Sequence, residues 1–102
     1  MKCHEHEFMI PVGHPVFVGH FPGNPMVPGV LLLDTVIYEM ETAMGMRITG
    51  YRLDTVKFHS PVPPGEPLRL RVTELDGKRV AFEMHAGTRL VAGGGFSGNL
   101  LE

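Results

Sequence analysis

The stretch that decides the fold is residues 20–45, HFPGNPMVPGVLLLDTVIYEMETAMG. Up to Pro28 it contains three prolines, and each proline fixes its own φ and pushes the preceding residue toward extended geometry. From Pro28 onward the residues suit a helix, with proline at the first helical position and Gly45 just beyond the end. The stretch therefore predicts a rigid loop that leads into a helix over residues 28–44.

The first turns of this predicted helix are apolar on nearly every side. Such a helix is typically surrounded by protein instead of lying on a wet surface. The carboxylates of Glu39 and Glu41 indicate that its C-terminal half reaches solvent. We therefore expect one central, buried helix. The apolar residues of its first turns are Val30, Leu31, Leu32, Leu33, Val36 and Ile37.

Patterns typical of strands follow the helix. Apolar residues recur over residues 46–59, and the proline-rich stretch PVPPGEP at residues 61–67 then forces a bend. Apolar and other residues alternate over residues 68–73 and again over residues 80–85, which predicts two half-buried strands. An Asp-Gly pair between them predicts a hairpin turn.

The last predicted strand, residues 89–96, follows a turn near Gly87 and contains three successive glycines. Glycines weaken a strand interior unless something packs close against the backbone. Near the start of the chain, residues 4–12 fit a strand running into Pro11. The order is therefore strand, long loop, one helix and a run of antiparallel strands. It predicts an α+β fold in which one curved antiparallel sheet wraps a central buried helix.

Length and composition limit the class of protein. The chain of 102 residues, 43% of them hydrophobic, has room for one core, so residues 1–102 are expected to form a single domain. The single cysteine, Cys3, excludes an internal disulfide and fits a reducing cytoplasm. The chain begins without an apolar leader and has no run of about 18 apolar residues, so we expect a soluble, cytoplasmic protein without a membrane span.

The charge balance bears on partners. A formal net charge of −2 argues against broad binding to nucleic acid. Four basic residues in the second half of the chain can still form a local basic face that would receive an acidic protein. These residues are Arg69, Arg71, Lys78 and Arg79.

Three parts of a catalytic site occur together near the helix start. His20 lies in the rigid loop and can take a proton near neutral pH. Gly29 lies at the helix start, where free N–H groups can stabilise a developing oxyanion. Asp34 lies about one and a half turns into the helix, where apolar neighbours would favour the protonated acid. The stretch therefore offers a base, an oxyanion site and an acid.

The run HFPGNPMVPGVLLLD, residues 20–34, resembles the signature of the hotdog-fold 3-hydroxyacyl-[acyl-carrier-protein] dehydratases of bacterial fatty acid synthesis. FMIPVGHPVFVGHFPG, residues 8–23, is similar to their preceding strand and loop, and VKFHSPVPPGEPLRLRV, residues 56–72, to their following strand pair. The C-terminal residues are similar to their closing hairpin. The resemblance covers nearly the whole chain. It extends to short relatives encoded with aryl-polyene or other specialised lipid pathways.

The resemblance implies a role for each matched residue. His20 matches the base that removes the α-proton of the thioester, and Gly29 matches the glycine whose backbone N–H polarises the thioester carbonyl. Asp34 matches the acid that protonates the departing 3-hydroxyl group. The resemblance also implies a hotdog fold, no cofactor or metal, and a substrate carried on an acyl carrier protein.

The family further implies a homodimer in which the histidine of one subunit meets the acid of the other at the mouth of an acyl tunnel. Two departures bear on this expectation. Tyr38 stands where the familiar dehydratases carry glutamine, and the chain lacks their N-terminal helix and first strand. A heterodimer with a related subunit therefore stays open.

Two other functions stay open as well. An acyl-thioesterase would use a carboxylate at the start of the central helix to activate water, but it would have no need of His20. A carrier-protein-binding subunit without activity of its own would need a catalytic partner. Outside the signature, a metal site at Cys3, His4 and His6 is poor because no fourth ligand lies nearby. The remaining histidines are expected at the surface or at sheet edges, and they are His14, His59 and His85.

Overall fold

The computed structural model describes residues 3–17, 26–45, 47–76 and 79–101. The predicted order of strand, loop, helix and strands is confirmed. In chain order the elements are β1 (Cys3–Phe8), a 3-10 turn (Pro15–Phe17), α1 (Gly29–Met44), β2 (Arg47–Phe58), β3 (Leu68–Asp76), β4 (Arg79–Ala86) and β5 (Arg89–Leu101).

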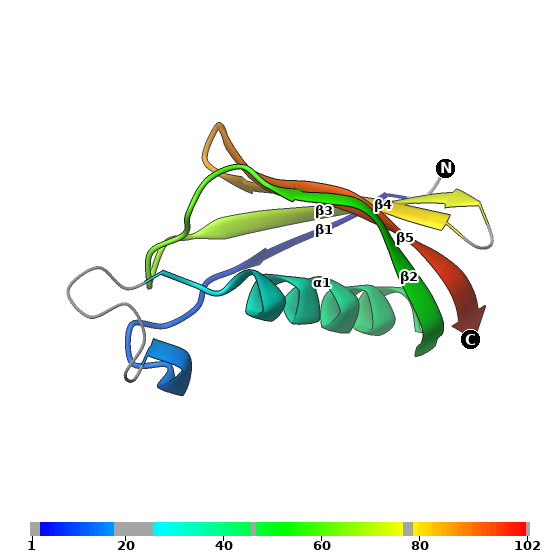
Figure 1. The fold of residues 1–102 in the computed structure, drawn as a ribbon, viewed down its shortest axis with the longest axis horizontal. Helices are drawn as coiled ribbons and strands as arrows, with labels where there is room; N and C mark the ends of the chain where they lie inside the picture. Colours follow the sequence, from blue (N-terminus) through cyan, green and yellow to red (C-terminus); the bar gives the residue numbers. More distant parts are fainter. Residues whose placement is uncertain (1–2, 18–25, 46, 77–78, 102) are drawn as a thin grey trace.

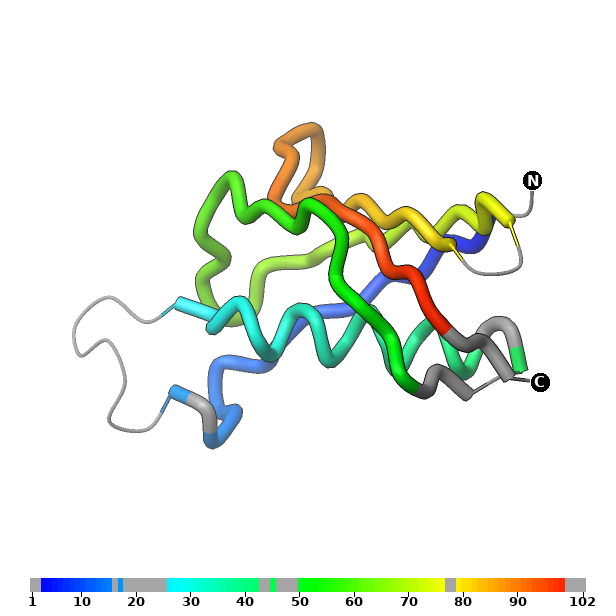
Figure 2. The backbone as a smooth tube through the Cα atoms, turned by 45° about the vertical axis from the view of Figure 1, so that its right-hand side comes forward, coloured from blue at the N-terminus to red at the C-terminus, as the bar shows by residue number. Residues whose placement is uncertain are grey.

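The strands form one five-stranded antiparallel sheet in the order β1-β3-β4-β5-β2. The sheet curves around one side of α1, and β2 and β5 bend together across the helix (Figures 1 and 2). β1 and β2 are the edge strands of this sheet. The α+β fold, with one helix against a curved antiparallel sheet, is therefore confirmed.

The core forms between the sheet and one face of α1. Burial alternates along β3 and β4 as the sequence predicts, because successive side chains of a strand point to opposite faces. The helix contributes residues that follow one another at a spacing of one turn. The buried residues of β3, β4 and α1 are Leu68, Leu70, Val72, Val80, Phe82, Met84, Leu32, Val36 and Met40.

Two glycine positions behave as the sequence predicts. Gly45 follows the end of α1 with a φ of 63°, and its N–H donates to Glu41 O, so it closes the helix in the left-handed conformation that glycine tolerates. In the glycine run of β5, a Cβ at Gly94 would lie 2.8 Å from Val56 Cα of β2. The run therefore lets the two strands approach closely.

The segment before the helix differs in detail from the expectation. β1 ends at Phe8 and does not continue to residue 12, because the chain turns where His14 N–H donates to Pro11 O at 3.0 Å. A 3-10 turn then interrupts the predicted non-helical loop. Pro28 has extended backbone (φ −62°, ψ 142°) and is the N-cap, so α1 begins one residue later than predicted.

Candidate active site

The N-terminus of α1 opens into a cavity of about 380 Å³. Its lining consists of residues 26–29, Leu32 and residues 58–62. Two backbone hydrogen bonds fix these walls, one from Val27 N–H to Val62 O (2.8 Å) and one from His59 N–H to Val91 O (2.7 Å). The chain before α1 and the chain after β2 are thereby held around the start of the helix.

Gly29 is the first helical residue and lines this cavity. Leu31 N–H and Leu32 N–H both donate to Pro28 O, at 3.0 and 3.3 Å, whereas earlier N–H groups of a helix have no acceptor within it. No side-chain hydrogen bond caps this end in the described part of the chain. Gly29 and Val30 therefore present N–H donors at the positive end of the helix dipole, where an oxyanion would be stabilised.

Phe58 gives residue 29 a steric reason to be glycine. An ideal Cβ at Gly29 would lie 2.8 Å from Phe58 Cζ, which is too close for a real contact. The Phe58 ring is 49% exposed and forms one wall of the cavity. Any side chain at residue 29 would therefore displace the ring or the helix, whatever the Gly29 N–H does.

Asp34 lies on the open face of α1 and does not line this cavity. With Val30 (72% exposed) and Tyr38 (64% exposed) it forms what we call the open stripe, three residues spaced one turn apart. Asp34 is exposed within the described part of the chain, so it is not buried among the apolar residues that flank it in the sequence, contrary to expectation. The sheet covers only one side of α1, so the helix is not wrapped all round (Figure 1).

Of the three predicted site residues, the described part of the chain contains Gly29 and Asp34, and it places them on different surfaces of α1. Gly29 lines the cavity and Asp34 lies on the open stripe. His20 lies outside the described residues. His59, expected at the surface or at a sheet edge, is exposed but lines the Gly29 cavity. Its position directly after a strand and before the PVPP bend was the signal that sequence reasoning missed.

The expectation of a basic face is wrong, because the strand register places glutamate side chains beside the arginine side chains. Arg69 and Arg71 lie on the outer face of the sheet. Glu7 lies directly opposite Arg69, and Glu5 lies directly opposite Arg71. Directly opposite residues share one face of an antiparallel pair. The outer face of β1 and β3 is therefore mixed in charge.

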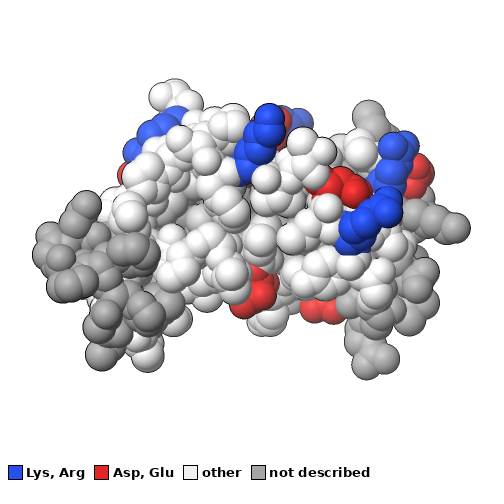
Figure 3. Space-filling view, in the orientation of Figure 1, with Lys and Arg blue, Asp and Glu red and all other residues white. Residues whose placement is uncertain are grey.

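Arg79, another residue predicted for a basic face, does not restore one. Arg79 Nε donates to Asp76 Oδ2 at 2.9 Å, and Lys78 lies outside the described residues. Basic and acidic side chains also lie near one another on the face shown in Figure 3. The pKa of Arg71 is raised above its ordinary value, first by the hydrogen bond from its Nε to Cys3 Sγ (3.1 Å) and then by the charges of Cys3 and Glu5.

Two features are absent from residues 3–17, 26–45, 47–76 and 79–101. Within them, no group of three or more His, Cys, Asp or Glu side chains is placed to hold a metal ion. The helix in this part of the chain lacks the length and apolarity needed to cross a membrane.

The chain is similar to known dehydratases. A model of the ApeI-like family, described as ApeI dehydratase, matches residues 1–95. The 3-hydroxyacyl-[acyl-carrier-protein] dehydratase FabZ of Herpetosiphon aurantiacus is 34% identical over 98 residues, which cover 83% of this chain and 69% of the relative. The chain spans about half the length of other FabZ relatives that it matches, 55% of one and 47% of another.

Solved structures are similar in fold. The dehydratase heterocomplex ApeI:P from Xenorhabdus doucetiae matches with a TM-score of 0.80 at 24% identity, over 98% of this chain and 88% of that chain. The fluoroacetyl-CoA thioesterase FlK matches with a TM-score of 0.65 at 15% identity, over 98% and 85%. Together with the single helix against a curved antiparallel sheet, these likenesses confirm the predicted hotdog fold.

Proposed function

Because this chain belongs to the ApeI-like dehydratase family, we propose that it removes water from 3-hydroxyacyl thioesters carried on an acyl carrier protein. The product is a trans-2-enoyl thioester. The observation that carries the proposal is the uncapped start of α1 at Gly29, which presents N–H donors inside a cavity. A thioester oxygen directed at these donors would be stabilised as its negative charge develops.

Each step of the reaction uses one of the three proposed residues. His20 takes the proton from C2, and the charge that moves onto the thioester oxygen is held by Gly29 N–H. The electron pair then forms the C2=C3 double bond as the C3–O bond breaks. Asp34 donates its proton to the departing hydroxyl group, which leaves as water. A proton passes from His20 to Asp34 before the next cycle, so the chemistry uses no cofactor.

We propose further that a second copy of the chain completes the site. Asp34 lies on the open stripe and away from the Gly29 cavity, so one chain does not enclose its own acid. The stripe is rich in exposed apolar surface, and edge strand β2 adds more, from Tyr51, Leu53 and Phe58. Exposed apolar patches are typical of interfaces. A two-fold dimer would place the partner's His20 against Asp34 and would cover both surfaces.

A related subunit, instead of a second copy of this chain, is the alternative partner that would cover the open stripe and β2. The similar dehydratase structure from Xenorhabdus doucetiae is a heterocomplex. If this chain needs such a subunit, it would be inactive alone and active in the mixture. Its acidic carrier would then dock on surface contributed by both subunits, which suits the mixed charge of the outer face of β1 and β3.

A thioesterase is the second candidate function. The observation that favours it is the exposure of Asp34 on the open stripe, because a carboxylate in contact with solvent can activate water. FlK shares the fold at low identity. Dehydration breaks bonds at C2 and C3 of the acyl group, whereas a thioesterase adds water at the carbonyl carbon and breaks the bond to sulfur. The two reactions therefore give different products, and one assay separates them.

The assay incubates the purified chain with a 3-hydroxyacyl carrier protein and reads the acyl group by mass spectrometry. We expect loss of one water with the thioester intact, and no such product from His20→Ala. Release of the free acid would identify a thioesterase instead. The absence of both products, with the chain alone and with a related subunit added, would contradict an enzymatic function.

A further inference from the structure

The face of β1 that looks toward α1 is polar where the core needs apolar side chains. His4 lies opposite Val72 of β3, and His6 lies opposite Leu70. Directly opposite residues share one face, and both β3 residues are buried in the core. A strand that packs one face on a core normally places apolar residues there. Core packing alone therefore does not explain why His4 and His6 occupy this face of β1.

Each imidazole meets a carboxylate. His6 Nε2 lies 3.2 Å from Glu39 Oε1 of α1, and His4 Nε2 lies 3.1 Å from Glu74 Oε2 of β3. The C-terminal half of α1 reaches solvent as predicted, at Tyr38 and Thr42, but the Glu39 side chain itself is only 16% exposed. A carboxylate withdrawn from water to this extent requires hydrogen-bond donors. His6 contacts one of its two oxygens.

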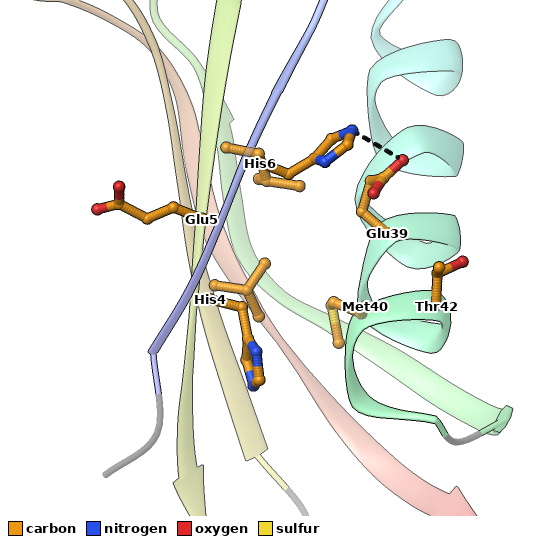
Figure 4. Close-up of a pocket in the computed structure, with 8 residues that line it drawn as sticks. His4, Glu5, His6, Glu39, Met40 and Thr42 are labelled. Atoms are coloured by element: carbon orange, nitrogen blue, oxygen red, sulfur yellow. Dashed lines mark ion pairs between the residues drawn. The ribbon is translucent and has the colours of Figure 1, made fainter.

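A cavity of about 220 Å³ lies beside this pair, between β1, β3 and the C-terminal half of α1 (Figure 4). In Figure 4, His6 and Glu39 reach toward each other across the gap, whereas Glu5 points away from it. The floor is apolar and buried, and the rim is polar. The floor consists of Met40, Leu70 and Val72, and the rim of His4, His6, Glu39 and Thr42.

This cavity is separate from the candidate active site. It shares no lining residue with the cavity at Gly29. It also lies next to edge strand β1, whereas the part of the proposed dimer interface that β2 contributes lies at the opposite edge of the sheet. A ligand bound here would therefore occupy neither the proposed reaction centre nor the β2 edge.

We propose that this cavity binds a small amine, with its ammonium group against Glu39 and its alkyl chain on the apolar floor. Charge favours a cation, because the carboxylate of Glu39 is directed at the cavity and the described residues of its lining include neither lysine nor arginine. Size favours a small ligand, because sites for drug-sized ligands usually start near ~300 Å³. The floor favours an alkyl chain, which it removes from water.

The test uses hexylammonium as the ligand and the full chain at pH 8, with isothermal titration calorimetry as the readout. We expect saturable binding of one hexylammonium per chain. Hexanoate and hexanol carry an alkyl chain of similar length but a negative or neutral head. Both are expected to bind at least ~10-fold more weakly, because charge-assisted hydrogen bonds to a carboxylate are the strong ones. This comparison needs no variant.

Matched variants locate the site. Glu39→Gln keeps the volume and removes the charge, so the affinity for hexylammonium should fall at least ~10-fold. Glu41→Gln changes a carboxylate on the same helix that lies outside the lining, and it should change the affinity by less than ~2-fold. Circular dichroism of both variants checks that the fold is kept.

Three results would overturn the proposal. They are equal affinity of Glu39→Gln and the unmodified chain, hexanoate binding as tightly as hexylammonium, or no saturable binding at all. In the last case the polar face of β1 serves only to protect an edge strand, since inward polar groups discourage pairing with other sheets. Because binding is measured directly, none of these results depends on the proposed dehydration.

Discussion

The two faces of α1 follow the same spacing but have opposite surroundings. On one face, Leu32, Val36 and Met40 are at most 4% exposed. On the other face, the residues of the open stripe follow one another at the same one-turn interval and are exposed. The difference lies in what covers each face, because the sheet packs against only one side of the helix (Figure 1). Within residues 3–17, 26–45, 47–76 and 79–101, the proposed catalytic acid on the open stripe is therefore left uncovered.

The largest expected effect is the loss of turnover in Asp34→Asn, on the open stripe. The side chain keeps its volume and loses its acid, so turnover should fall by roughly 10²–10⁴-fold. The free energy of unfolding should change by less than about 0.5 kcal/mol, because Asp34 is exposed within the chain. Steady-state kinetics and denaturant unfolding measure the two quantities. Near-normal turnover would remove Asp34 from the mechanism.

Shortening one side chain on each face of α1 tests whether only the face toward the sheet is packed within the chain. Met40 is fully buried, and Met40→Ala should lower the free energy of unfolding by about 2–5 kcal/mol. Tyr38→Ala should cost less than about 0.5 kcal/mol at dilutions where the chain is monomeric, but should weaken self-association. Denaturant unfolding and analytical ultracentrifugation give these values. Equal destabilisation of the monomer by both variants would show that the stripe is covered within the chain.

A smaller effect than that of Met40→Ala is expected at the helix start. Gly29→Ala places a Cβ against Phe58 and should cost about 1–3 kcal/mol of unfolding free energy, as overpacking does. In a Phe58→Ala background the same substitution should cost less than half as much, because the ring is gone. A double-mutant cycle by denaturant unfolding measures the difference. An unchanged cost in both backgrounds would show that the ring is not what requires glycine at this position.

Local patterns predicted much of the fold. Pro28 and Gly45 bracket the helix to within one residue, because proline and glycine act on their own backbone. The alternation in β3 and β4 matches the observed burial, because a strand places successive side chains on opposite faces. The glycine run of β5 indicates the close approach of β2.

The surroundings of the charged residues could not be predicted from local patterns. Asp34 looks enclosed in the sequence because apolar residues flank it, but within the described part of the chain it lies on the exposed side of α1. The pairing of His6 with Glu39 joins the first strand to the helix, and no local pattern encodes such a contact. Arg71 seemed part of a basic face until the strand register placed Glu5 opposite it.

The measurement that tests the account most directly is complementation between two inactive variants. His20→Ala and Asp34→Asn homodimers should each be inactive, and equal amounts of the two chains are refolded together. Random pairing makes about half of the dimers mixed, and a two-fold interface gives each mixed dimer one site with both lesions and one site with neither. If Asp34 acts with the partner's His20, activity should recover to roughly a quarter of the unmodified level. If both residues act from one chain, every site of a mixed dimer carries one lesion, and mixing would restore nothing.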